Sequence, residues 1–206
     1  AFAFASCTNN AKPKEKYKAS FLDLFDTAST VIAYDNNQEE FDRKYQQFYD
    51  ELKTYDELFD IYNHYDGITN LYDVNKTAAD SPVKVDKKII GMLLYGKEIY
   101  NTTEGKMNIC MGSVLTLWHN EREYGIANPD DAKLPDVSKL KEAAKHTDID
   151  NLVIDTNNNT VYFKDPDMKL DVGAIAKGYA VEQITEWAKA NLWTSAAISI
   201  GGNVST

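Results

Sequence analysis

One continuous apolar stripe constrains the fold of this 206-residue chain more than any other feature. Large apolar side chains recur at alternating spacings of four and three residues, at Phe41, Tyr45, Phe48, Leu52, Tyr55, Phe59 and Tyr62. This is the repeat of one face of an α-helix. The stripe therefore predicts a long helix that packs along a core, and only its end near Tyr62 is a candidate for a binding site.

Other segments before residue 140 have weaker patterns. Residues 21–34 are rich in β-branched and aromatic side chains, and they predict a first strand. Residues 63–86 contain Asp-Gly and Ser-Pro pairs and are expected to be irregular. A second helix is predicted over 86–100, with an aspartate as its N-cap. A charged, proline-containing excursion is expected over 119–137.

The last third of the chain alternates between short strands and helices. The asparagines between two of the strands tolerate positive φ and favour a hairpin. The expected elements are, in order, a short helix at 139–146, strands at 152–155 and 160–164, a strand ending at 170–173, a helix over 174–191 and a strand at 196–200. Because helices and hairpins are interspersed, we expect one α+β domain over 21–206, with a mixed β-sheet and packed helices.

Composition excludes several classes of protein. Hydrophobic residues make up 43% of the chain, which is enough for a substantial core. The net charge is −10 and no basic stripe is present, so nucleic acid is not an expected partner. No apolar run approaches the roughly 20 residues that a membrane-spanning helix needs.

The first residues resemble the end of a bacterial lipoprotein signal peptide. A short apolar run ends in Ala5 and Ser6 before Cys7, and in such signals the cysteine is lipidated. The alternative is a frayed apolar end with an idle thiol. Under the lipoprotein interpretation, residues 1–20 are the signal remnant and tether, and the protein is extracytoplasmic and lipid-anchored to the bacterial cell membrane.

The segment 170–178 carries the sharpest chemical signal. A predicted strand ends at a glycine, and a helix follows at once. The free amide groups at a helix start can bind an anion. Lys177 would lie in the first turn, where the helix dipole disfavours a cation unless a phosphate neutralises it. The alternative is an ordinary strand–helix junction with Lys177 in solvent.

The sequence Asp-Val-Gly-Ala-Ile-Ala-Lys-Gly-Tyr-Ala at 171–180 resembles the signature of the ApbE family of FAD:protein FMN transferases. The resemblance implies that Asp171 and Lys177 contact FAD, and that the carbonyl oxygen of Ala174 is a ligand of Mg²⁺. An oxygen ligand is one that magnesium prefers.

Other segments match the family in order from about residue 21 to the end. Phe25 begins a segment similar to the family's Met-Gly-Thr near its first strand, and Tyr62, followed by Asn75, is implied as a flavin contact. The segment 105–118 resembles a further FAD-binding segment, which implies contacts from Met107, Asn108 and Ile109. Here the chain departs from the family's Phe-Asp-Pro-Thr version. Residues 198–203 resemble the family's Ser-x-Gly-Gly-Asn.

The resemblance implies transfer of FMN from FAD to a threonine of an acceptor flavoprotein subunit, of redox-pump or reductase type, with release of AMP. Two alternatives stay open: an FAD pyrophosphatase of the same family, and a non-catalytic flavin-binding lipoprotein. Family members continue further, and the base and remaining metal ligands are expected beyond Thr206. His64, His119 and His146 match no catalytic position of the family and are expected to be surface residues.

Overall fold

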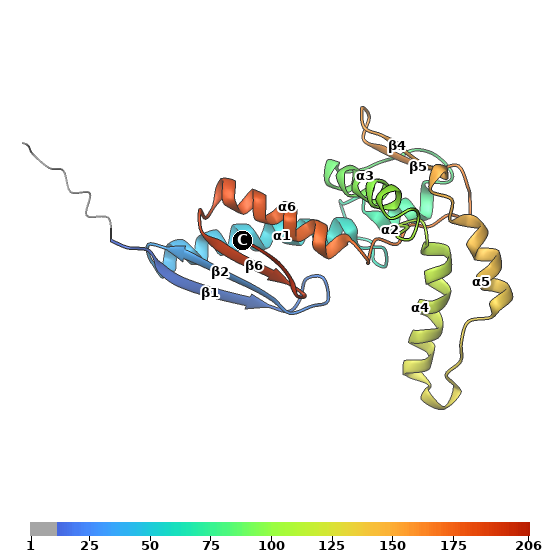
Figure 1. The fold of residues 1–206 in the computed structure, drawn as a ribbon, viewed down its shortest axis with the longest axis horizontal. Coiled ribbons are helices and arrows are strands. Elements are labelled where there is room, and N and C mark those ends of the chain that lie inside the picture. The colour runs from blue at the N-terminus through green and yellow to red at the C-terminus, as the bar shows by residue number, and fades with distance from the viewer. Residues whose placement is uncertain (1–11) are drawn as a thin grey trace, which may run out of the picture. The chain divides into compact units, whose positions relative to one another are not determined.

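A computed structural model describes residues 12–206, whose secondary-structure elements are labelled in Figure 1. The predictions that concern Cys7 and the apolar run before it lie outside the described residues. The chain forms two compact units. The first comprises the described residues up to Leu52 together with Val181–Thr206, and the second comprises Lys53–Ala180.

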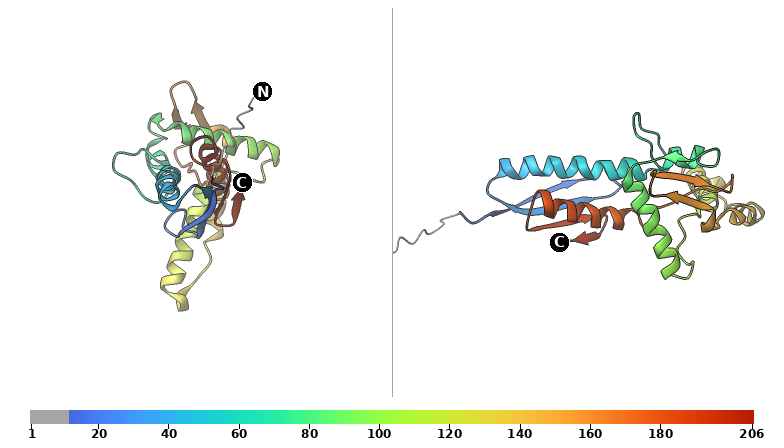
Figure 2. Two further views of the ribbon diagram at one scale, coloured as in Figure 1. Left: turned by 90° about the vertical axis from the view of Figure 1, so that its left-hand side faces the viewer. Right: turned by 90° about the horizontal axis from the view of Figure 1, so that it is seen from above.

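The first unit is built on a four-stranded antiparallel sheet with the strand order β1-β2-β6-β7. The strands are β1 (Glu15–Phe21), β2 (Ser29–Asp35), β6 (Ala196–Ile200) and β7 (Asn203–Ser205). Along β2 every second residue is buried, so one face of the sheet points into a core. Parts of α1 (Gln38–Phe59) and α6 (Ala176–Asn191) cover that face, as Figure 2 shows.

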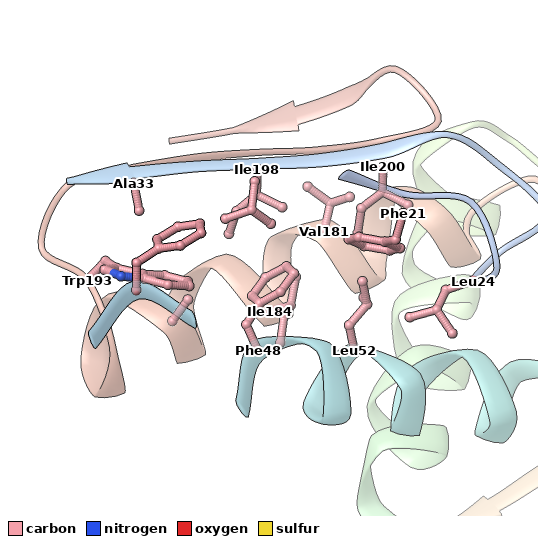
Figure 3. Close-up of a cluster of buried hydrophobic side chains, with 13 residues drawn as sticks. Phe21, Leu24, Ala33, Phe48, Leu52, Val181, Ile184, Trp193, Ile198 and Ile200 are labelled. Carbon is pink, nitrogen blue, oxygen red and sulfur yellow. The ribbon is translucent and has the colours of Figure 1, made fainter. Parts of the chain in front are cut away.

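The core of this unit lies between the sheet and the two helices (Figure 3). Phe41, Phe48 and Leu52 of the predicted stripe are buried there. From α6 and the loop after it come Ile184 and Trp193, whose ring lies 5.7 Å from that of Phe41. The long apolar stripe therefore has the core-packing role that its spacing predicts.

A buried polar network lies at one edge of this core. The Asp35 carboxylate is fully buried and accepts hydrogen bonds from the Lys44 ammonium at 2.8 and 2.9 Å. It also accepts from the indole Nε1–H of Trp193 at 3.0 Å and from the backbone N–H of Asn36 at 2.9 Å. Desolvation raises the pKa of Asp35, but the hydrogen bonds from Lys44, Asn36 and Trp193 outweigh it and leave the pKa lowered.

The second unit contains a small antiparallel sheet with the order β3-β5-β4. Its strands are β3 (Val83–Lys84), β4 (Leu152–Asp155) and β5 (Thr160–Phe163). Its α-helices are α2 (Leu71–Thr77), α3 (Lys87–Thr102), α4 (Gly112–Ala127) and α5 (Val137–Ala143). Three short 3₁₀ turns join them, η1 (Pro129–Asp131), η2 (Ala144–His146) and η3 (Ile149–Asn151). Figure 1 shows α4 and α5 side by side.

The α+β class is confirmed, and within residues 12–206 every strand pairing is antiparallel. The Asp86 N-cap is also confirmed, because its carboxylate accepts from the backbone N–H of Lys88 at 2.7 Å. The hairpin at 152–163 forms as predicted, with Asn159 at φ 53° in its turn. Among the described residues, no helix combines the length and apolar character needed to cross a membrane.

The first predicted strand, 21–34, is wrong as a single element. Residues 22–28 form a turn between β1 and β2, and Phe25 and Asp26 have positive φ values of 55° and 49°. The strands on the two sides of this turn, β1 and β2, pair with each other as an antiparallel hairpin. Strand β1 begins at Glu15, so part of the segment that was expected to be a tether belongs to the sheet.

Two helices fall where loops were expected. Helix α4 extends to Ala127, into the expected excursion, and among its residues only Gly112 is fully buried. A helix without a buried stripe lacks the periodic signal that identifies helices in a sequence. Helix α2 lies within the segment expected to be irregular. Asn70 caps it reciprocally with Asp73, and this capping box is the local sequence signal that marks the start of the helix.

Candidate functional site

A cavity of about 270 Å³ opens in the second unit, where the segment 169–171 meets α2 and α4. Its volume is close to the lower end of the range for small-molecule sites. The polar and aromatic residues that line it include Tyr62, Asn75, Lys76, Thr116, His119 and Asp171. Two of the residues that the family resemblance implies as FAD contacts, Tyr62 and Asp171, are therefore brought together in one cavity.

Asn75 holds the segment that carries Asp171. Its amide Nδ2 donates to the Leu170 carbonyl oxygen at 2.9 Å, and its Oδ1 accepts from the Leu170 N–H at 2.7 Å. Leu170 is buried, and the Asn75 side chain satisfies both its backbone N–H and its carbonyl. These two bonds take the place of the bonds that a neighbouring β-strand would make. The strand predicted at 170–173 does not form, and this amide pairing takes its place.

The loop before α4 supports the same segment from another side. The backbone N–H of Gly112 donates to the Lys169 carbonyl at 3.0 Å, and that of Asp171 donates to the Ile109 carbonyl at 2.8 Å. A Cβ on residue 112 would lie 2.6 Å from the Lys169 carbonyl oxygen, so only glycine allows this approach. The segments are therefore in backbone contact beside the cavity.

Asp171 and Lys177 bracket the start of α6. The Asp171 Oδ1 accepts the backbone N–H of Gly173 at 2.9 Å, which fixes the turn into the helix. The helix begins at Ala176, two residues later than predicted, and Lys177 lies in its first turn as expected. Ala174 lies in the exposed turn between them, which leaves its backbone in reach of a ligand from solvent.

Tyr62 lies three residues beyond the end of α1, and its side chain is 55% exposed. Its ring stacks on His119 of α4, with 4.8 Å between the ring centroids. Burial raises the pKa of the Tyr62 hydroxyl, and the nearby Asp171 carboxylate raises it further. The hydroxyl is therefore protonated at neutral pH and can donate a hydrogen bond within the cavity.

The residues Met107, Asn108 and Ile109 do not line this cavity. The Asn108 side chain is occupied within the fold, where it donates to the Thr147 carbonyl and accepts from the Cys110 N–H, both at 2.8 Å. Ile109 is buried. Cys110 is also buried, which raises the pKa of its thiol to about 12 and makes it unreactive at neutral pH. In this structure the segment 107–109 supports the cavity wall through its backbone, because the Ile109 carbonyl accepts the N–H of Asp171.

Phe25 belongs to the other unit, where it packs against the core in the β1–β2 turn. In the same unit, the paired glycines Gly201 and Gly202 form the β6–β7 turn at φ values of 56° and 87°. A Cβ on Gly201 would lie 2.8 Å from the Thr27 hydroxyl oxygen. The close backbone approach expected of the two glycines is thus found at Gly201, beside Thr27.

His64 is exposed as expected and His119 and His146 are half-buried, but each of the three contacts a neighbouring side chain. His64 Nδ1 lies 2.9 Å from the Asp73 carboxylate, and His146 Nδ1 lies 3.0 Å from both oxygens of Asp165. Asp167 is also close to His146, with 3.9 Å between Nε2 and Oδ2. These pairs are not evident from the sequence; the partners of His146, for example, lie about 20 residues further along the chain. His119, which stacks on Tyr62, was missed for the same reason.

The Asn75 pairing gives a stability prediction. Asn75→Ala is expected to lower the free energy of unfolding by about 2–3 kcal/mol, because both backbone groups of the buried Leu170 lose their partner. Urea unfolding measures the change. Asn128→Ala is the matched control, since the side chain of that exposed asparagine donates to the Tyr124 carbonyl at the end of its own helix. Equal effects of the two substitutions would contradict the role of Asn75.

Comparisons with known proteins identify the family of the chain. The family model described as "ApbE family" matches residues 25–206. The FAD:protein FMN transferase of Klebsiella pneumoniae is 24% identical over 155 residues, which cover 75% of this chain and 46% of the relative. The enzyme of the same name from Treponema pallidum is 29% identical over 136 residues, which cover 64% and 36%.

Solved structures show the same fold. A mutant of the flavin transferase ApbE from Vibrio cholerae superposes with a TM-score of 0.76 at 18% identity, covering 92% of this chain and 62% of the other. The ApbE protein from Thermotoga maritima gives a TM-score of 0.72 at 20% identity, covering 91% and 57%. The chain spans about half of the length of the Klebsiella relative and a smaller share of the Treponema relative. It spans less than two thirds of each of these two solved chains.

Proposed function

Because the chain belongs to the ApbE family, we propose that it transfers FMN from FAD to an acceptor protein. The observation that carries the proposal is the position of the family motif. Asp171 lies at the wall of a cavity with an aromatic side, and Lys177 lies in the helix turn that follows. An aromatic wall suits a flavin ring, and a lysine at a helix start suits a pyrophosphate.

The proposed reaction is a displacement at the phosphorus of the FMN half of FAD. A threonine hydroxyl of the acceptor attacks this phosphorus and forms a new P–O bond. The P–O bond to the AMP half breaks, AMP leaves with the bonding electrons, and the hydroxyl proton passes to a base. The acceptor then carries FMN as a phosphate ester of its threonine.

The described residues would bind and orient the FAD. Tyr62 offers an aromatic face and a protonated hydroxyl to the flavin. Lys177 would hold an oxygen of the pyrophosphate by a charge-assisted hydrogen bond. The Asp171 carboxylate fixes the turn before α6 through Gly173 and retains a second oxygen that can accept from the cofactor.

Magnesium is part of this proposal because the family resemblance implies it. The Ala174 carbonyl is a hard oxygen ligand in an exposed turn, which fits the ion in kind. One such ligand does not hold magnesium, and phosphate oxygens and water are its usual further ligands. When bound, the ion would neutralise charge on the pyrophosphate and polarise the attacked phosphorus.

The acceptor and the cellular location are also proposals. The acceptor would be a flavoprotein subunit of redox-pump or reductase type that carries the target threonine. The protein would be extracytoplasmic, anchored to the bacterial cell membrane through a lipid on Cys7. The apolar run before that cysteine supports the anchor. Mass spectrometry of the native N-terminus tests it, and an unmodified Cys7 in a cytosolic protein would exclude it.

The activity is tested with the protein expressed from its complete gene. FAD and Mg²⁺ are supplied with and without an acceptor protein, and both AMP and protein-bound flavin are measured. AMP release that depends on the acceptor, matched by bound flavin, is expected. AMP release without acceptor would instead indicate an FAD pyrophosphatase. Flavin binding without any AMP release would indicate a flavin-binding protein without catalysis.

A further inference from the structure

One face of the Tyr62 ring is covered by His119. The ring centroids are 4.8 Å apart and the planes are inclined by 27°, so the two rings are in stacking contact. No third ring fits between rings in contact. Tyr62 is still 55% exposed and lines the cavity, so a planar ligand has only its other face to stack on.

Arg122 contacts the imidazole ring of His119. A terminal nitrogen of its guanidinium lies 3.0 Å from the His119 Nδ1, one helical turn away on α4. A guanidinium can donate a hydrogen bond but cannot accept one, so Nδ1 must be the acceptor. The lone pair of Nδ1 then points at the guanidinium. Arg122 therefore orients the imidazole that stacks on Tyr62.

The backbone of Tyr62 is held independently of this stack. The Asp60 Oδ1 accepts the N–H groups of Tyr62 and Asn63 at 2.6 and 3.1 Å. The other oxygen of Asp60 accepts the Tyr65 hydroxyl at 2.9 Å. With its backbone fixed by Asp60 and its ring fixed by His119, Tyr62 loses little conformational freedom when a ligand binds. Such pre-organisation strengthens binding.

We propose that His119 is a positioning residue for the flavin: it acts through Tyr62, whose free face it presents to the isoalloxazine ring. The ligand chemistry is a planar tricyclic ring, which belongs to the riboflavin half of FAD and not to its AMP half. This inference rests on the proposed use of FAD. His119 also lines the cavity, but in this inference it acts through its contact with Tyr62 and not through a contact with the ligand.

The test titrates riboflavin and, separately, ADP into the wild-type protein and its variants. His119→Ala is expected to weaken riboflavin binding by about 2- to 10-fold, the usual worth of an aromatic pair. Binding of ADP, which lacks the flavin ring, is expected to stay within twofold of wild type. His119→Phe is the conservative variant, because it keeps a ring for stacking, and it should restore most of the riboflavin affinity.

A double-mutant cycle with Tyr62→Ala separates positioning from direct contact. If His119 acts through Tyr62, His119→Ala has no further effect on riboflavin affinity once Tyr62 is removed. A persisting effect would mean that His119 contacts the ligand itself, which contradicts the proposal. An equal loss of ADP binding would mean general damage to the site and would also overturn it.

This experiment can fail separately from the proposed function. Riboflavin affinity does not depend on transfer, so a coupled Tyr62–His119 pair in a protein that releases no AMP would overturn the function and keep the inference. If the protein transfers flavin normally but His119→Ala leaves its riboflavin affinity unchanged, the inference is overturned and the proposed function stands. Absence of riboflavin binding by the wild-type protein would also overturn the inference.

Discussion

Replacing Asp35 with alanine is expected to lower the free energy of unfolding by about 3–5 kcal/mol. The carboxylate is fully buried and accepts four hydrogen bonds, two of them from Lys44. The Lys44 side chain is itself only 16% exposed. Without Asp35, a largely buried ammonium and the indole N–H of Trp193 lose their acceptor. Urea unfolding at neutral pH measures the loss.

Asp42→Ala is the matched control for Asp35→Ala. Asp42 lies on the same helix α1 and accepts one hydrogen bond, from Gln38 at 2.7 Å, but it is exposed. Its replacement is expected to change the unfolding free energy by less than about 1 kcal/mol. A loss for Asp35→Ala no larger than that of the control would show that the network does not stabilise the sheet and its helices.

The same network predicts the sign of an acid effect. The pKa of Asp35 in the folded protein is lowered below the usual value of an aspartate by the hydrogen bonds that its carboxylate accepts. Its contribution to stability is therefore complete above about pH 4, and it is lost as the pH falls through the folded-state pKa. The difference in unfolding free energy between wild type and Asp35→Ala should shrink as the pH is lowered below 4. A difference that grows in acid would contradict this assignment.

Replacing Lys177 with alanine is expected to weaken FAD binding by about 10- to 150-fold. A charge-assisted hydrogen bond to a phosphate oxygen contributes roughly 1.5–3 kcal/mol, which corresponds to that range. The reason to expect a phosphate is the position of the residue, because a cation in the first turn of α6 opposes the helix dipole unless an anion binds nearby. Titration of FAD by flavin fluorescence measures the affinity.

Lys189→Ala serves as the control because it removes the same charge from the same helix. Lys189 lies in the last turn of α6, where the dipole favours a cation, and it pairs with Glu186 at 3.2 Å. FAD affinity should be unchanged in this variant. If both lysine variants bind FAD as the wild type does, Lys177 does not contact the pyrophosphate, and the proposed anion site at the start of α6 is wrong.

The elements that the sequence predicted well are those whose pattern is local and strong. The seven-residue apolar stripe predicted α1 because its spacing leaves one buried face, and Phe41, Phe48 and Leu52 are buried as expected. Asp86 marked the start of α3, and the asparagines before Thr160 marked a hairpin turn. The motif at 171–178 identified the family, and Asp171 does line the cavity.

The features that were missed depend on tertiary contacts. Helix α4 has one fully buried residue, so it leaves no periodic signal in the sequence. The segment at 170 was expected to be a strand, but the amide of Asn75, 95 residues earlier, satisfies its backbone. His119 gains its role from stacking on Tyr62, which is 57 positions away. No local pattern reports contacts of this range.

The most direct test of the proposed function follows the phosphorus atom. FAD labelled at the phosphorus of its FMN half is incubated with the complete protein, Mg²⁺ and an acceptor that carries the target threonine. The label is expected on the acceptor, with an equal amount of unlabelled AMP in solution. No label is expected on an acceptor whose target threonine is replaced by alanine. Label in free FMN with none on the acceptor, or label that stays in intact FAD, would contradict the transfer of FMN to protein.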